Sequence, residues 1–133
     1  MTTGPSATVG APAFDRLTVL RPGQEAVAYL NVTATLPLLA THFPRYPILP
    51  GVLIVEGAVA LARLAAGIPE LRLRHATRLR FRRFIVPGDR VELTATAHPA
   101  PGAAGDSSWR AEARVDGEIA ASIGTLTLTR ALG

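Results

Sequence analysis

Alternation between apolar and polar positions divides most of this chain into short strand-like segments. Residues 24–35 (QEAVAYLNVTAT) alternate in this way, which is typical of a strand whose two faces differ. One predicted face carries Val27 and Tyr29, and the other carries Ala28, Leu30 and Val32. Residues 14–20, closed by the turn signal Arg21-Pro22-Gly23, are expected to form a further short element.

Residues 52–66 (VLIVEGAVALARLAA) instead form a continuous apolar run. The run is long for a strand, and its alanines and leucines favour a helix. Because the run is apolar almost all round, the helix should be buried on most of its sides. Gly67 is expected to cap the helix, and Pro69 prevents its continuation.

The rest of the chain again alternates with the period of a strand. Asp116-Gly117 predicts a two-residue hairpin turn, and Pro87-Gly88-Asp89 predicts another turn. The alternation slips at Arg83-Phe84 and again past Gly124, where we expect β-bulges. The four segments expected to form strands are residues 76–86, 91–97, 109–115 and 118–129.

These elements predict an α+β fold in which an antiparallel β-sheet wraps around one long central helix. Residues 1–12 are expected to form a flexible N-terminus and residues 13–130 a single domain. One helix does not fully cover a sheet of five or six strands, so exposed edges should remain. Pairing with a second subunit is therefore expected.

Composition excludes several classes of site. The chain has no cysteine, which excludes disulfides and thiolate zinc sites, and its three histidines lack metal-ligand spacing. Glu56 and Arg63 interrupt the apolar run, so no membrane span is expected. The first ten residues do not resemble a signal peptide, and a cytoplasmic location is the expectation.

The positive charge is concentrated in one part of the chain. All 14 basic residues are arginines, and seven of them fall between Arg72 and Arg90, against one acid, Asp89. This local excess indicates an anionic partner, unless the arginines only solvate a strand face. Nucleic acid is the weaker candidate, because recognition-helix and zinc-finger patterns are absent. The candidate contact residues are Arg78, Arg80, Arg82 and Arg83.

Glu56 is the candidate acid, because the predicted helix around it is apolar. An ionised carboxylate is rarely buried without a partner. Arg63, seven residues further on, lies about 10.5 Å away along a helix, too far for a direct ion pair. Burial without a partner favours the protonated form of a carboxyl group, which then serves as a general acid. A glutamate that reaches solvent or another backbone remains the alternative.

His42 and Gly51 complete the candidate site. Histidine is the usual general base near neutral pH. Pro50-Gly51-Val52 precedes the predicted helix, where free amides and the helix dipole favour a developing negative charge. Gly51 allows a ligand to approach the backbone closely. An ordinary loop-to-helix junction remains the alternative, and a PxxP ligand is disfavoured by the apolar residues between the prolines.

The segment His42 to Glu56 (HFPRYPILPGVLIVE) resembles the active-site signature of the FabZ/FabA-type 3-hydroxyacyl-ACP dehydratases. A second block, Leu79 to Ala97 with its Val-Pro-Gly-Asp turn, is also similar to that family, and the resemblance extends over residues 14–129. It implies the hotdog fold and dehydration of a (3R)-hydroxyacyl-ACP to the trans-2-enoyl-ACP in fatty-acid or polyketide-type biosynthesis.

The resemblance also implies roles for individual residues. His42 removes the C2 proton, Glu56 protonates the departing hydroxyl, and the amides of Gly51 and Val52 hold the thioester oxygen. Acyl carrier protein (ACP) carries the substrate on phosphopantetheine and docks on the arginine cluster, and no metal or other cofactor is needed. In this family each site lies at a dimer interface, with histidine and acid from different chains.

Two residues depart from the family pattern, because Thr41 and Arg45 stand where glycines are usual. These departures bear on substrate preference more than on the chemistry. The homodimer could assemble further into a trimer of dimers, or the second chain could be a different hotdog protein. The alternatives for function are a hotdog thioesterase, a CoA-linked hydratase, or a non-catalytic subunit of a heteromeric dehydratase.

Overall fold

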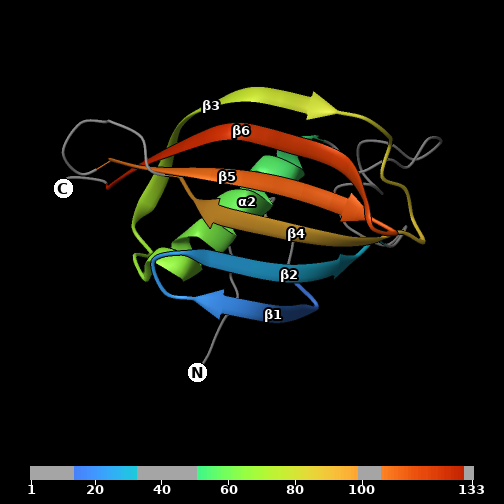
Figure 1. Cartoon of the computed structure of the whole chain (residues 1–133), viewed down its shortest axis with the longest axis horizontal. Helices are drawn as coiled ribbons and strands as arrows, with labels where there is room; N and C mark the ends of the chain where they lie inside the picture. The colour runs from blue at the N-terminus through green and yellow to red at the C-terminus, as the bar shows by residue number, and fades with distance from the viewer. Residues whose placement is uncertain (1–13, 33–50, 99–105, 131–133) are drawn as a thin grey trace.

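The computed structural model describes residues 14–32, 51–98 and 106–130, which form a six-stranded antiparallel sheet and one helix, α2 (Figure 1). The strands lie in the order β1-β2-β4-β5-β6-β3, so β1 and β3 are the two edges. The helix is α2 (Gly51–Ala66), and the strands are β1 (Arg16–Arg21), β2 (Glu25–Asn31), β3 (Leu71–Phe81), β4 (Arg90–Ala97), β5 (Asp106–Val115) and β6 (Glu118–Arg130).

The sheet packs against α2 with one face, as Figure 1 shows, and the alternation of each strand explains why. In β4, for example, Val91, Leu93 and Ala95 are buried, while the residues between them lie on the outer face. This confirms the predicted α+β hotdog architecture of a sheet around one helix. Large side chains of the inner face include Val91, Leu93, Trp109, Val115, Ile123, Leu126 and Leu128.

Helix α2 ends as the sequence predicts, at Gly67. Gly67 has a positive φ of 70°, and its N–H donates to the carbonyl of Arg63 at 2.9 Å. The N–H of Ile68 donates to the same carbonyl at 3.2 Å, so the last turn is capped through a left-handed glycine. The chain then turns at Pro69 and enters β3 at Leu71.

The predicted strand over residues 76–86 is misplaced at both ends. Strand β3 begins earlier, at Leu71, and ends at Phe81, so Arg82 and Arg83 follow the strand and do not extend its outer face. Pairing with β6 does not stop at Phe81, because the N–H groups of Arg82 and Arg83 both donate to the carbonyl of Ala120, at 2.7 and 3.4 Å. Two residues thus lie opposite one where β3 ends, which is an irregularity of the kind that the slip at Arg83-Phe84 predicts, one residue earlier.

The bulge predicted past Gly124 is confirmed. In β6 the residues that pair with Trp109 and Ala111 of β5 are Leu126 and Ile123, so one extra residue lies on the β6 side. Opposite it in β3, Arg78 has a positive φ of 56°. A Cβ at position 124 would lie 2.7 Å from Cβ of Arg78, which explains the glycine.

The turn between β3 and β4 is anchored to the end of β2. The N–H of Gly88 donates to the carbonyl of Val32 at 2.8 Å, and the N–H of Val32 donates to the carbonyl of Asp89 at 2.9 Å. The carboxylate of Asp89 accepts a hydrogen bond from the N–H of Val86 at 3.0 Å and from Arg83 at 3.5 Å. This side chain therefore fixes the turn and one member of the arginine cluster.

The outer face of the sheet is polar and carries its own side-chain contacts. The hydroxyl of Tyr29 donates to Oε2 of Glu92 at 2.9 Å, and this bond and the charge of Glu92 raise the pKa of Tyr29. The guanidinium of Arg90 lies 4.0 Å from the centroid of the same ring. These contacts stabilise the side of the sheet that faces away from α2.

Replacing Gly124 by alanine tests the steric account of the bulge. Because the new Cβ meets Cβ of Arg78, we expect Gly124→Ala to lower the free energy of unfolding by about 1–3 kcal/mol. In an Arg78→Gly background the same substitution should have an effect below about 0.5 kcal/mol. Urea unfolding followed by the fluorescence of Trp109 measures both values. Equal losses in the two backgrounds would show that the contact is not the cause.

Candidate active site

Glu56 lies on the one side of α2 that the sheet leaves partly uncovered. The helix is buried at most positions, but Glu56, Ala60 and Arg63 are half-buried and Leu64 is exposed. These residues follow the spacing of a single helix face. We call them the Glu56 strip: Glu56, Ala60, Arg63 and Leu64.

The carboxyl group of Glu56 is partly withdrawn from water. Oε2 is buried and has no hydrogen-bond partner among the residues that the structure describes. Buried polar atoms are generally paired, and an unpaired one in a native fold often marks a functional site. Glu56 thus lies in an apolar helix, as the sequence predicts, and its role as an acid stays a prediction.

The Glu56 strip faces the β3 edge of the sheet. Nε of Arg63 donates a hydrogen bond to the carbonyl of Leu71, the first residue of β3, at 2.6 Å. On the inner side of β3 the apolar residues Leu73, Leu79 and Phe81 remain 43%, 39% and 55% exposed. Arg63 thus brings one end of the Glu56 strip to the strand that carries these exposed apolar side chains.

Gly51 is the first residue of α2, and Phe81 packs directly against it. A Cβ at position 51 would lie 2.7 Å from Cζ of Phe81. The sequence predicts close approach to the backbone here, and the described structure shows that the approaching group is this ring. Phe81 is the last residue of β3, so it brings the end of that strand to the start of the helix.

His42 lies outside the described residues, as do Thr41 and Arg45. Its role as a base therefore stays a prediction, as do the expected contacts of the Gly51 and Val52 amides with a thioester. The described residues that flank the segment 33–50 are Val32 and Gly51. Both lie beside residues 81–89, through the backbone bonds of Val32 and the contact of Phe81 with Gly51.

The predicted arginine cluster separates into members with different surroundings. Arg78 lies against Gly124 at the bulge, and Arg83 pairs with Asp89 at 3.5 Å. Arg80 and Arg82 flank Phe81 and are exposed, and neither has an acidic partner within the described parts of the chain.

Arg72 belongs to the same exposed face of β3, but our sequence-based selection missed it. It pairs with Thr129, as Arg80 pairs with Ser122, on the side opposite to Leu73 and Leu79. The alternation of Leu71, Arg72 and Leu73 was a signal that the strand begins before residue 76.

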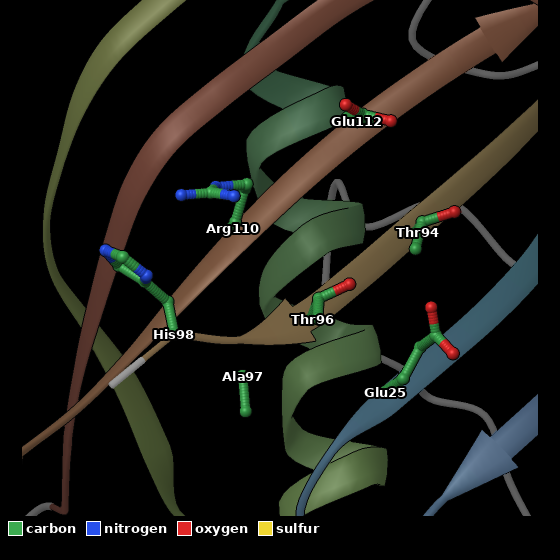
Figure 2. Close-up of a pocket in the computed structure, with 7 residues that line it drawn as sticks. All are labelled: Glu25, Thr94, Thr96, Ala97, His98, Arg110 and Glu112. Carbon is green, nitrogen blue, oxygen red and sulfur yellow. The ribbon is translucent and has the colours of Figure 1, made fainter. Parts of the chain in front are cut away.

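A separate polar hollow of about 290 Å³ lies on the outer face of the sheet (Figure 2). Thr94 and Thr96 lie between the longer side chains of Glu25, Arg110 and Glu112, and His98 closes one end in Figure 2. These residues alternate with buried inner-face residues such as Ala95 and Ala111. The hollow is therefore on the opposite face of the sheet from α2 and Glu56.

The described residues contain no cluster of three or more His, Cys, Asp or Glu side chains placed to hold a metal ion. Within those same ranges, no helix has the length and hydropathy required to cross a membrane.

Solved structures with similar folds include the dehydratase heterocomplex ApeI:P from Xenorhabdus doucetiae, with a TM-score of 0.72, 22% identity, and coverage of 90% of this chain and 98% of that one. A second is the phenylacetic acid degradation protein PaaI from Thermus thermophilus, in a mutant form, with a TM-score of 0.65, 24% identity, and coverage of 87% and 92%. At these identities the likeness establishes the fold, which is the hotdog fold.

Sequence similarity identifies the family, whereas the structural similarity establishes only the fold. The model of the ApeI-like family (ApeI dehydratase) matches residues 19–122. The 3-hydroxyacyl-[acyl-carrier-protein] dehydratase FabZ of Bacillus velezensis is 38% identical over 128 residues, covering 90% of this chain and 85% of the relative. FabZ of Streptococcus mutans is 41% identical over 113 residues, covering 77% and 76%. The chain belongs to the ApeI-like and FabZ family of 3-hydroxyacyl-ACP dehydratases.

The contact between Gly51 and Phe81 gives a test of the site geometry. Because a methyl group at position 51 would press on the ring, we expect Gly51→Ala to lower the free energy of unfolding by about 1 kcal/mol. In a Phe81→Ala background the ring is absent, and alanine should be neutral or stabilising at this helical position. Thermal unfolding of the wild-type protein, the two single variants and the double variant measures the coupling between Gly51→Ala and Phe81→Ala. If the two effects on stability simply add, the ring does not contact position 51.

Proposed function

We propose that this dehydratase removes water from a (3R)-hydroxyacyl thioester on ACP, in fatty-acid or polyketide-type biosynthesis, with Glu56 as the acid and His42 as the base. The observation that supports this most directly is the buried Oε2 of Glu56, which has no hydrogen-bond partner among the described residues and lies in an apolar helix of a member of this family. A buried polar atom left without a partner in this way often marks a functional site.

The proposed reaction requires two proton transfers. His42 takes the C2 proton of the substrate, and the electron pair forms the C2–C3 double bond as the C3–O bond breaks. Glu56 gives its proton to the departing hydroxyl, which leaves as water. Negative charge develops on the thioester oxygen, and the amides of Gly51 and Val52 at the start of α2 are the proposed donors to it. This chemistry needs no metal or other cofactor.

We propose that two copies of the chain share each site. Strand β3 is an edge of the sheet, so the backbone N–H and C=O groups on its free edge can pair with a strand of another chain. Its inner side carries the exposed Leu73, Leu79 and Phe81, which a second subunit would cover together with the Glu56 strip. An interface here would place Glu56 next to the other chain, from which His42 is proposed to come.

We further propose that ACP docks on Arg72, Arg80 and Arg82. These exposed arginines lie along β3 and its end, and Phe81 links this end to the start of α2. ACP is acidic, so it would be steered to this surface by charge. A cytoplasmic location remains a prediction.

Variants of the two catalytic residues test the proposed roles. His42→Ala and Glu56→Gln should each reduce turnover of 3-hydroxyacyl-ACP by roughly 10²–10⁴-fold, because each removes one proton-transfer group. Circular dichroism provides the folding control for both variants. Retained turnover in either folded variant would refute the role assigned to that residue.

Mixing the two inactive variants tests whether the site is shared. After unfolding and refolding together, half of the dimers contain one chain of each kind and have one intact site. About a quarter of the normal activity should return, as expected for a two-fold symmetric interface. No recovery from a refolded mixture would contradict a shared site. Activity that returns only with a different hotdog chain would favour a heteromeric enzyme like the ApeI:P complex.

Charge reversal tests the docking surface. Arg80→Glu combined with Arg82→Glu should lower kcat/KM for acyl-ACP substrates by about tenfold or more, with a steep dependence on salt. A short N-acetylcysteamine thioester does not need ACP and should be affected little. Arg110→Glu, an exposed position on the outer face, is the matched control. Equal losses on both kinds of substrate would exclude a docking role.

A further inference from the structure

Three residues of the Glu56 strip lie in line along α2. Glu56, Ala60 and Arg63 are separated by four and three residues, which places them on one helix face. All three are half-buried, while the residues between them are buried. An acyl chain that started at the proposed acid and followed this helix face would pass Ala60 and then meet Arg63.

Arg63 is held across the end of this path. Its Nε donates to the carbonyl of Leu71 at 2.6 Å, which ties the side chain from α2 to the first residue of β3. Arg63 lies two helical turns beyond Glu56, or about 10.5 Å along the axis. The hydrogen bond thus holds the Arg63 guanidinium beside Leu71, at the far end of the strip from Glu56.

The residues before Arg63 suit an alkyl chain. Ala60 lies one turn beyond Glu56 and carries only a methyl group. This side chain is apolar and small enough for an alkyl chain to lie beside the helix. Across from α2, the inner side of β3 presents the exposed apolar side chains of Leu73 and Leu79. An alkyl chain would therefore meet apolar groups along this path and a fixed cation at its end.

We propose that Arg63 limits the length of the acyl chain that this dehydratase accepts. A longer chain must displace the guanidinium, which breaks its bond to Leu71 and leaves a charged group beside alkyl carbon. Shorter chains end before Arg63 and avoid this penalty. This inference rests on the proposed role of Glu56, which fixes where the reacting end of the substrate lies.

Two substitutions should change the chain-length preference in opposite directions. The substrates are 3-hydroxybutanoyl-, 3-hydroxyoctanoyl- and 3-hydroxyhexadecanoyl-ACP. Arg63→Ala should raise the kcat/KM of the hexadecanoyl substrate relative to that of the octanoyl substrate by about tenfold. This factor corresponds to roughly two further methylene groups entering an apolar site. Ala60→Leu should lower the ratio for octanoyl to butanoyl by a similar factor, because it fills the path one turn from Glu56.

Arg110→Ala is the matched control, since it removes an exposed arginine from the outer face and should leave both ratios unchanged. If Arg63→Ala does not fold, Arg63→Met decides, because it removes the cation and keeps a long side chain at this position. Unchanged ratios in the folded variants would overturn the role of Arg63. Failure of the proposed function is distinguishable, because the wild-type protein would then dehydrate none of the three substrates.

Discussion

The structure depends on burying one almost wholly apolar helix inside a single sheet. Helix α2 fills the inner side of the sheet with residues such as Leu61, Ala62 and Ala58, which are fully buried. This arrangement supplies most of the apolar burial that the fold needs. It also places the two charged residues of the helix, Glu56 and Arg63, in a demanding environment. The fold withdraws one oxygen of the Glu56 carboxyl group from water while leaving its side of the helix partly uncovered, which is what makes Glu56 the candidate acid.

The incomplete coverage of α2 links the fold to the proposed assembly and specificity. The sheet ends at β3, and the apolar inner side of that edge strand remains exposed beside the Glu56 strip. A second chain at this edge would cover both and bring in the proposed base. The hydrogen bond from Arg63 to Leu71 closes the other end of the strip. One uncovered side of the helix thus links the candidate acid, the proposed interface and the proposed path for the acyl chain.

The periodicity of the sequence predicts much of this fold because the four inner strands, β2, β4, β5 and β6, each bury one face. The hairpin at Asp116-Gly117, the cap at Gly67 and the bulge past Gly124 also have local signals, and the structure confirms each. The ends of β3 are less clear, because an edge strand is exposed on both sides and carries no clear apolar boundary. The alternation at Leu71, Arg72 and Leu73 does indicate the earlier start, but the prediction began the strand at residue 76 and extended it to residue 86.

Local sequence also singles out Glu56, an acid within an apolar run, and Gly51, a glycine at a helix start, as candidates, and their roles stay predictions. It could not identify the contact of Phe81 with Gly51 or that of Arg63 with Leu71, since these depend on how β3 returns along the helix. The most direct test of the account is mass spectrometry of 3-hydroxyacyl-ACP incubated with the wild-type protein. The account predicts carrier protein lighter by one water with its acyl group still attached. An unchanged mass, or release of the acyl group as a free acid, would contradict it.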